Sequence, residues 1–88
     1  MTFTVVLKRT HRLGNDTVLK KGTVIITSDS PEAAAIAALR DAADSKISPA
    51  IFGDAGLNDG EYQIEVLSIT DSLFGKVTRS PSTFSWRS

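Results

Sequence analysis

Apolar and polar residues alternate at the start of the chain, which is the pattern of a strand with one buried face. The alternation covers residues 2–9, and its apolar positions are Phe3, Val5 and Leu7. The segment Leu13-Gly14-Asn15-Asp16 follows and predicts a tight turn, because Gly and Asn accept the positive φ that such turns need.

Residues 17–27 predict a second, longer strand because they are rich in β-branched side chains. With residues 2–9 this strand would form an antiparallel hairpin. Gly22 interrupts the β-branched run, and an isolated glycine in a strand indicates a bulge or a bend.

A helix start is clearly marked after the hairpin. Ser30 is a suitable N-cap, Pro31 fits the first helical position, and Glu32 places negative charge near the positive end of the helix dipole. Seven alanines follow between residues 33 and 43, with Ile36 and Leu39 spaced to face a sheet. We expect the helix to end near Asp44 or Ser45, because Ser48-Pro49 cannot continue it.

Residues 46–60 predict a loop with a few apolar anchors, namely Ile47, Ile51, Phe52 and Leu57. Residues 61–69 predict a third strand in which Tyr62, Ile64 and Val66 share one face. Leu67 and Ile69 fall at odd-numbered positions, whereas the apolar residues before them fall at even-numbered ones, so a bulge or twist is expected there. In the tail, residues 74–78 and 83–86 each fit a short edge strand, separated by Ser80-Pro81.

These elements predict the α+β class, with an antiparallel sheet of three to four strands and one helix packed on one face, in the order ββαβ(β). Residues 1–88 would form a single domain, in which residues 70–88 are either a loosely packed tail or an edge strand. The sheet face opposite the helix would then be open to solvent or to a partner.

Composition narrows the functional classes. The chain of 88 residues has no cysteine, so a disulfide framework is excluded and the usual ligands of a structural zinc site are missing. No apolar run approaches the ~18 residues of a membrane span, and the N-terminus does not match a signal peptide. We therefore expect a cytoplasmic protein that does not contact a membrane.

The net charge of zero conceals three blocks of opposite sign. Residues 1–28 carry five Lys or Arg and one Asp, a net charge of +4, whereas residues 29–71 have a net charge of −7. Residues 72–88 carry three cations and no acid, a net charge of +3. This segregation along the sequence bears on partners more than on fold.

Nothing in the sequence supports catalysis or cofactor binding. His11 is the only histidine and is interpreted as a solvated residue of the hairpin turn, since no triad or metal site can be built on it by spacing. The run Asp54–Gly60 lacks the register and the distal Glu of a calcium loop. No phosphate-binding or nucleophile-elbow motif occurs. The chain is expected to be non-enzymatic, with no catalytic, cofactor or metal residues.

Two groups of residues are candidates for contacts with a partner. The first lies around the turn end of the hairpin and consists of Lys8, Arg9, Arg12, Lys20 and Lys21. The second lies in the C-terminal segment, where the aromatic residues Phe84 and Trp86 stand among the cations Lys76, Arg79 and Arg87. Cations with stacking aromatics can hold single-stranded nucleic acid. The same cations can instead protect sheet edges, and the two aromatics can either pack as a last strand or form an exposed anchor.

The segment Ser28-Asp29-Ser30-Pro31-Glu32-Ala33-Ala34-Ala35, following Lys21-Gly22-Thr23-Val24-Ile25-Ile26, resembles many small phage-encoded proteins, some anti-CRISPR proteins among them. These place a hairpin ahead of an alanine-rich helix capped by Ser-Pro-Glu or Asp-Pro-Glu. The resemblance is one of layout and covers residues 3–69. Many such inhibitors are strongly acidic, and the zero net charge departs from this. The resemblance implies only a small protein that acts by occupying a partner's surface, in the host cytoplasm if it is phage-encoded.

Three functional hypotheses follow. The first is an interaction module, a phage accessory or inhibitor protein that binds another protein through the open sheet face or the segregated charges. The second is a nucleic-acid-binding protein that uses the basic hairpin and the aromatic C-terminus. The third is a virion or structural component that self-associates, as a homodimer or a larger assembly, through an edge strand.

Overall fold

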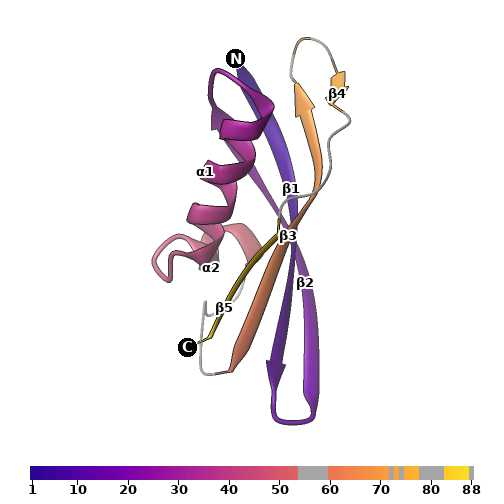
Figure 1. Cartoon of the computed structure of the whole chain (residues 1–88), viewed down its shortest axis with the longest axis vertical. Coiled ribbons are helices and arrows are strands. Elements are labelled where there is room, and N and C mark those ends of the chain that lie inside the picture. The colour runs from indigo at the N-terminus through magenta and orange to yellow at the C-terminus, as the bar shows by residue number, and fades with distance from the viewer. Residues whose placement is uncertain (54–59, 72, 74, 78–82, 88) are drawn as a thin grey trace.

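The computed structural model describes residues 1–53, 60–71, 73, 75–77 and 83–87 and shows an α+β arrangement of one sheet and two helices (Figure 1). The strands and helices follow one another as β1 (Thr2–Leu13), β2 (Asp16–Thr27), α1 (Pro31–Ala43), α2 (Ser48–Phe52), β3 (Glu61–Asp71), β4 (Gly75–Val77) and β5 (Thr83–Arg87). The predicted fold class is confirmed.

All pairings in the sheet are antiparallel, and its order is β2-β1-β3-β4. β3 pairs with β1 along one edge. Its other edge is shared by two short strands, with β4 beside residues 69–71 and β5 beside residues 61–65. The described part of the chain thus has five strands where three to four were predicted, and both proposed edge strands of the tail are present.

The β1–β2 hairpin is longer than predicted because both strands run up to a two-residue turn. Leu13 pairs with Asp16, which leaves only Gly14 and Asn15 between the strands. Gly14 has a φ of 62°, and the described residues contain no positive φ other than those of glycines. A glycine at the first central position is typical of a type II′ turn, whose twist matches that of the flanking strands.

The predicted irregularity in the third strand is confirmed. The β1–β3 register shifts between Val6 and Leu7, where Val6 faces Ser68 and Leu7 faces Val66, so Leu67 is the extra residue of a bulge. The bulge moves the buried side chains of β3 from even to odd positions. Gly22, by contrast, marks no bulge, because the β1–β2 register runs unbroken through it.

The helix α1 begins and ends where the sequence predicts. The Ser30 hydroxyl accepts a hydrogen bond of 3.1 Å from the Ala33 backbone N–H, and Asp44 is the C-cap. The face packed against the sheet consists of small residues and one leucine, namely Ala34, Ala35, Ala38, Leu39 and Ala42. The prediction that Ile36 faces the sheet is wrong: its side chain is 53% exposed.

The segment predicted as a loop contains the short helix α2. Phe52 is buried, and Ile51 packs against the core. A Cβ atom at Gly22 would lie 2.5 Å from the Ile51 backbone oxygen, so only glycine lets α2 approach β2 this closely. The physical role of Gly22 is therefore close packing. Ile47 is exposed, and Leu57 lies outside the described residues.

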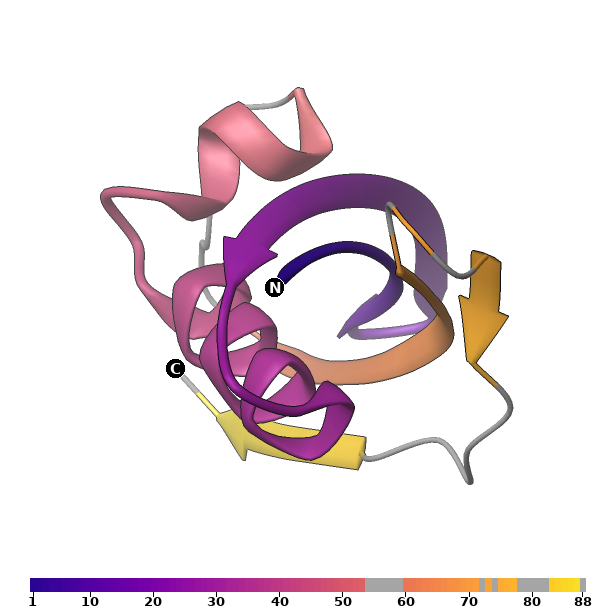
Figure 2. The ribbon, with the colours of Figure 1, turned by 90° about the horizontal axis from the view of Figure 1, so that it is seen from above.

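The two faces of the sheet differ in what covers them. Seen from above, the strands sweep in an arc, and α1 lies on the inner, concave side of this arc (Figure 2). Alternate β1 residues on the helix side form the core with the alanines of α1 and with apolar residues of β3, including Ile64 and Val66. On the opposite side of β2, β1 and β3 we find no covering element in the described part of the chain. We call that side the open face.

Candidate interaction surface

Arg9 does not lie at the surface, which corrects the prediction that it joins an exposed basic cluster. Its side chain is only 3% exposed. The guanidinium carbon lies 4.6 Å from the centre of the Phe52 ring and 5.7 Å from that of Tyr62, and Nη1 donates a hydrogen bond of 3.3 Å to the Ser48 hydroxyl. Arg9 therefore ties β1 to α2 and β3, and it is not available for contacts with a partner.

The remaining hairpin cations are divided between the two faces of the sheet. Residues directly opposite each other in an antiparallel pair share a face. Lys20 pairs with Arg9 and so belongs to the helix side, whereas Lys21 pairs with Lys8 on the open face. Arg12 is exposed and has the same parity as Lys8. The structure therefore brings Lys8, Lys21 and Arg12 to one face and separates them from Lys20.

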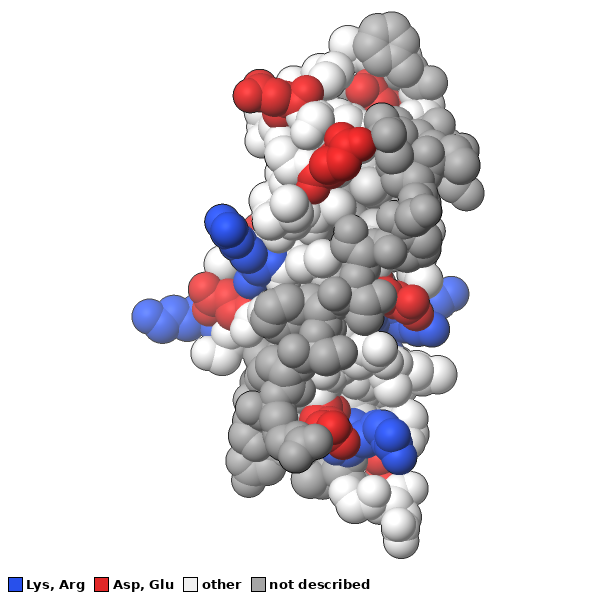
Figure 3. Space-filling view, viewed as in Figure 1, with Lys and Arg blue, Asp and Glu red and all other residues white. Residues whose placement is uncertain are grey.

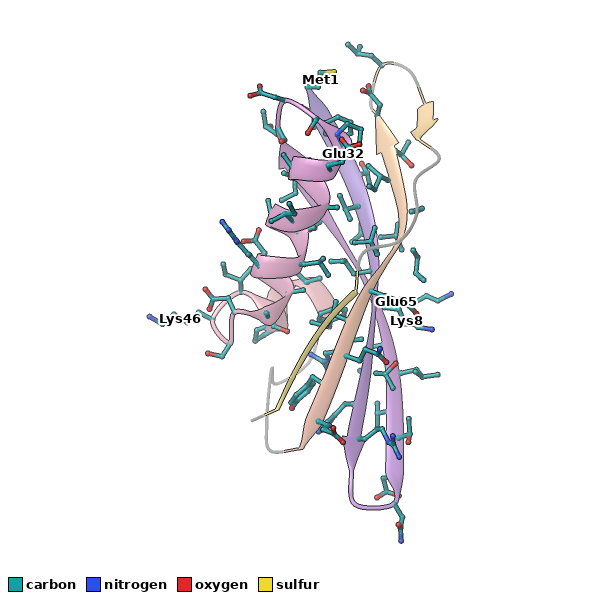
Figure 4. The ribbon with its side chains drawn as sticks, in the orientation of Figure 1. Met1, Lys8, Glu32, Lys46 and Glu65 are labelled. Atoms are coloured by element: carbon teal, nitrogen blue, oxygen red, sulfur yellow. The ribbon has the colours of Figure 1, made fainter. Side chains whose placement is uncertain are left out.

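Acidic residues of β3 lie among these cations. The Lys8 ammonium nitrogen is 2.7 Å from Oε1 of Glu65, and both side chains lie on the side of the sheet away from α1 (Figure 4). Arg12 is opposite Glu61 in the register. On the side in view, cationic and acidic side chains lie next to each other over the middle and lower parts of the molecule (Figure 3). The charge blocks of the sequence therefore do not form a field of one sign on the side in view, and the Lys8–Glu65 pair shows that the open face also carries both signs of charge.

Along β2, β1 and β3, the other half of the open face has no charged residue among those described. It is formed by threonines, a serine and aliphatic residues of three adjacent strands: Thr2, Thr4, Val6, Thr23, Ile25, Thr27, Leu67, Ser68 and Thr70. Ile25 is 68% exposed, and Leu67 is 39% exposed. We call these residues the neutral patch. The row of Lys21, Lys8 and Glu65 borders it, and an uncharged centre with a charged rim is a common plan of protein interfaces.

His11 is part of β1 rather than a solvated turn residue, which corrects its interpretation. Its ring stacks on that of Tyr62, with centroids 4.3 Å apart and planes inclined by 8°. Tyr62 is also one of the two rings next to Arg9. His11 therefore extends the aromatic cluster at the lower end of the helix side.

The C-terminal candidates are only partly described. Lys76 pairs with Thr70 through the backbone of β4, and in β5 Phe84 pairs with Ile64 and Trp86 with Tyr62. The last-strand interpretation is thus confirmed for the backbone. Arg79 lies outside the described residues, as do residues 54–59, which contain most of the run compared with a calcium loop.

The described residues contain no group of three or more His, Cys, Asp or Glu side chains placed to hold a metal ion. None of their helices is long and apolar enough to span a membrane.

Sequence reasoning missed the neutral patch, although part of its signal was present. All threonines of the predicted hairpin strands fall on one face of the alternation, namely Thr2, Thr4, Thr17, Thr23 and Thr27. The parity change at Leu67 marks the point where an apolar side chain leaves the core. The same parity argument puts Arg9 with Phe3, Val5 and Leu7, on the face that is buried. The alternation of apolar and polar positions thus predicts that Arg9 is buried, as it is in the structure, whereas its charge predicts that it is exposed.

Comparison of the chain with protein-family models, with curated proteins and with solved structures gives no match.

Proposed function

We propose that this chain is a non-enzymatic protein-binding module whose contact surface is the open face of the sheet. The observation that carries the proposal is the neutral patch. Ile25 of the edge strand β2 and Leu67 at the bulge of β3 are exposed on either side of β1, on a sheet whose strand pairing holds them in place. An exposed aliphatic group on such a rigid platform gains free energy when another surface excludes water from it.

The arrangement favours a protein partner over other classes. Hydroxyl groups of threonine and serine surround the exposed aliphatic side chains, and both signs of charge lie at the border. Such a surface offers apolar contact at its centre and hydrogen bonds and ion pairs at its rim. An accessory or inhibitor protein of the phage type would use the face in this way, by blocking a functional surface of its target.

Nucleic acid is the weaker proposal. The nucleic-acid hypothesis depends on a cluster of hairpin cations that could contact successive phosphates. Arg9 is buried, Lys20 is on the other face from Lys8 and Lys21, and Glu65 is paired with Lys8. An acidic side chain within the cationic row would repel a phosphate backbone that follows β1.

The proposal is tested by comparing two matched substitutions, Ile25→Lys on the open face and Ile36→Lys on the outer side of α1. Both replace an exposed isoleucine, so both should leave the fold intact by circular dichroism. We expect a protein captured from cell lysate by the wild-type chain to be captured equally by Ile36→Lys, and at least tenfold less by Ile25→Lys.

Equal capture by both variants would show that the open face is not the contact surface. A gel shift with single-stranded and double-stranded DNA at low salt addresses the alternative. Affinity that falls steeply with salt and is lost in Lys8→Ala together with Arg12→Ala would favour the nucleic-acid function instead.

A further inference from the structure

We propose that the turn end of the β1–β2 hairpin is a second contact site, which binds the same segment of another copy of this chain by edge-to-edge pairing of β2. The two β2 strands would run antiparallel through residues 16–20, with a two-fold axis at Val18. This inference goes beyond the proposed function, because it uses an edge of the sheet and not the open face.

The edge strand β2 has backbone groups that point away from the sheet. It pairs with β1 on one side, and the described part of the chain contains no strand on its other side. Ser28 donates a backbone hydrogen bond of 2.9 Å to the Met1 oxygen, which fixes the phase of the β1–β2 ladder. Hydrogen-bonded and non-hydrogen-bonded pairs alternate, so the even-numbered residues of β2 bond to β1. The N–H and C=O groups of Thr17 and Leu19 therefore point outward, toward the free edge.

The turn end is the accessible part of this edge. Farther along β2, α2 packs on the strand at Gly22. An axis at Gly22 would bring the two α2 helices together, because paired strands lie about 4.8 Å apart and packed helices need about 8–10 Å. The turn end instead extends below both helices (Figure 1), and residues 16–19 are all exposed. Another strand can therefore reach the edge there.

The charges of β2 favour a second copy as that strand and indicate its register. Asp16 is the only acid of β2, and Lys20 lies four residues farther along, about 13 Å away, too far for an ion pair within one strand. The residue opposite Lys20 in β1 is Arg9, another cation. In an antiparallel pair centred on Val18, each Asp16 lies directly opposite Lys20 of the other copy. Opposite charges in that position are stabilising, and the contact occurs twice.

The backbone permits this register. Odd-numbered residues point outward in both copies, so a hydrogen-bonded pair must join two of them, and here Thr17 of each copy pairs with Leu19 of the other. Val18 faces Val18 of the other copy in a non-hydrogen-bonded pair on the axis, where the Cα atoms are about 4.5 Å apart and the side chains touch. Val18 is 46% exposed in the single chain, so the pairing removes apolar surface from water.

The two lysines of β2 disfavour the neighbouring registers. An axis at Lys20 or at Lys21 would place like charges directly opposite each other. An axis at Leu19 would place Lys20 opposite Val18 and would form no ion pair. Charged side chains commonly limit the pairing of edge strands in this way, and here they leave the register centred on Val18 as the favoured one.

The contact is short, which sets its expected strength. It consists of two hydrogen-bonded pairs and extends over roughly 17 Å of each strand. The buried area is well below the ~800 Å² per partner of a standard stable interface. We therefore expect a dissociation constant in the high micromolar range or above, and association must be measured up to about 2 mM.

The test is sedimentation velocity of the full chain from about 20 μM to 2 mM. We expect the wild type to shift from monomer to dimer over this range. Asp16→Lys and Lys20→Asp, each measured alone, should remain monomeric at every concentration. Lys46→Asp is the matched control, because it makes the same change of charge at an exposed residue between α1 and α2, and it should dimerise like the wild type. Circular dichroism verifies the fold of each variant.

The decisive sample is an equimolar mixture of Asp16→Lys and Lys20→Asp. Each variant alone places like charges at both ion-pair positions, whereas the mixed dimer has opposite charges at both. We therefore expect the mixture to dimerise although neither component does. A change of fold in either variant could not produce this rescue. In the wild type, hydrogen exchange of the Thr17 and Leu19 amides should slow as the concentration rises, because only the dimer bonds these outward groups.

Three results would overturn the inference: a wild-type chain that stays monomeric at about 2 mM, an Asp16→Lys or Lys20→Asp variant that dimerises like the wild type, or a mixture that stays monomeric while the wild type dimerises. The proposed function is judged separately. A monomeric chain that captures another protein in an Ile25-dependent manner would leave the open face as its contact surface. A chain that dimerises as described, while Ile25→Lys and Ile36→Lys capture equally, would leave only the hairpin contact.

Discussion

The two faces of the same three strands differ in what surrounds their side chains. Val5 and Val6 are neighbours in β1, yet Val5 is fully buried under the helices and Val6 is half-buried on the open face. On the helix side even an arginine is enclosed, between two aromatic rings, whereas on the open face an isoleucine is left in water. In a domain this small one face supplies most of the core, so the other is free to serve contacts.

Among the substitutions that test this comparison, Arg9→Ala is expected to lower the free energy of unfolding the most. The substitution removes a desolvated cation between Phe52 and Tyr62, together with the hydrogen bond to Ser48, and it leaves a cavity. We expect the free energy of unfolding to fall by about 3 kcal/mol, a size usual for buried groups. Urea denaturation at 10 μM protein measures it.

Arg9→Met is the matched control for volume. Methionine keeps an unbranched chain of similar length and makes favourable contacts with aromatic rings, so the loss should be about 1 kcal/mol. If Arg9→Ala cost no more than an ordinary surface substitution, within about 0.5 kcal/mol, the buried placement of Arg9 would be refuted.

An intermediate effect on the free energy of unfolding is expected when the two neighbouring valines are replaced one at a time. Val5→Ala removes two buried methyl groups from the core and should lower the free energy of unfolding by about 2 kcal/mol. Val6→Ala removes the same atoms from a half-buried site and should cost less than about 1 kcal/mol. Equal losses in thermal or urea denaturation would mean that both faces are covered.

The smallest effect is the coupling between Lys8 and Glu65. Their ion pair is short but partly exposed, so water screens it. A double-mutant cycle with Lys8→Ala and Glu65→Ala should give a coupling energy of about 0.5 kcal/mol, reduced further by 0.5 M salt. A coupling above about 2 kcal/mol would show that the open face is shielded from solvent.

Much of the fold could be predicted from local pattern. The Ser30 cap, the Gly14 turn and the parity change at Leu67 each depend on residues close together in the sequence, and all three are present in the structure. Less could be predicted of the candidate surface. Lys8, Lys21 and Arg12 do lie on one face, but Arg9 and Lys20 do not, and the neutral patch was not predicted at all.

The failures have a common physical origin. Ile36 was assigned to the helix–sheet interface because it is apolar, but only alanines let the helix lie so close to the strands, and Leu39 fills the space beside them. Gly22 was assigned to a bulge because glycine weakens strands, but its role is to admit Ile51 of α2. Each error concerns a contact between elements that are distant along the chain.

The sequence by itself determined the hairpin, its turn, the capped alanine helix and the bulge, because these follow from backbone preferences and short-range periodicity. Only the tertiary structure decided that Arg9 is enclosed, that Lys8 meets Glu65 and that the neutral patch spans three strands. Those features depend on β1 lying between β2 and β3, and strand order is set by packing over the whole chain.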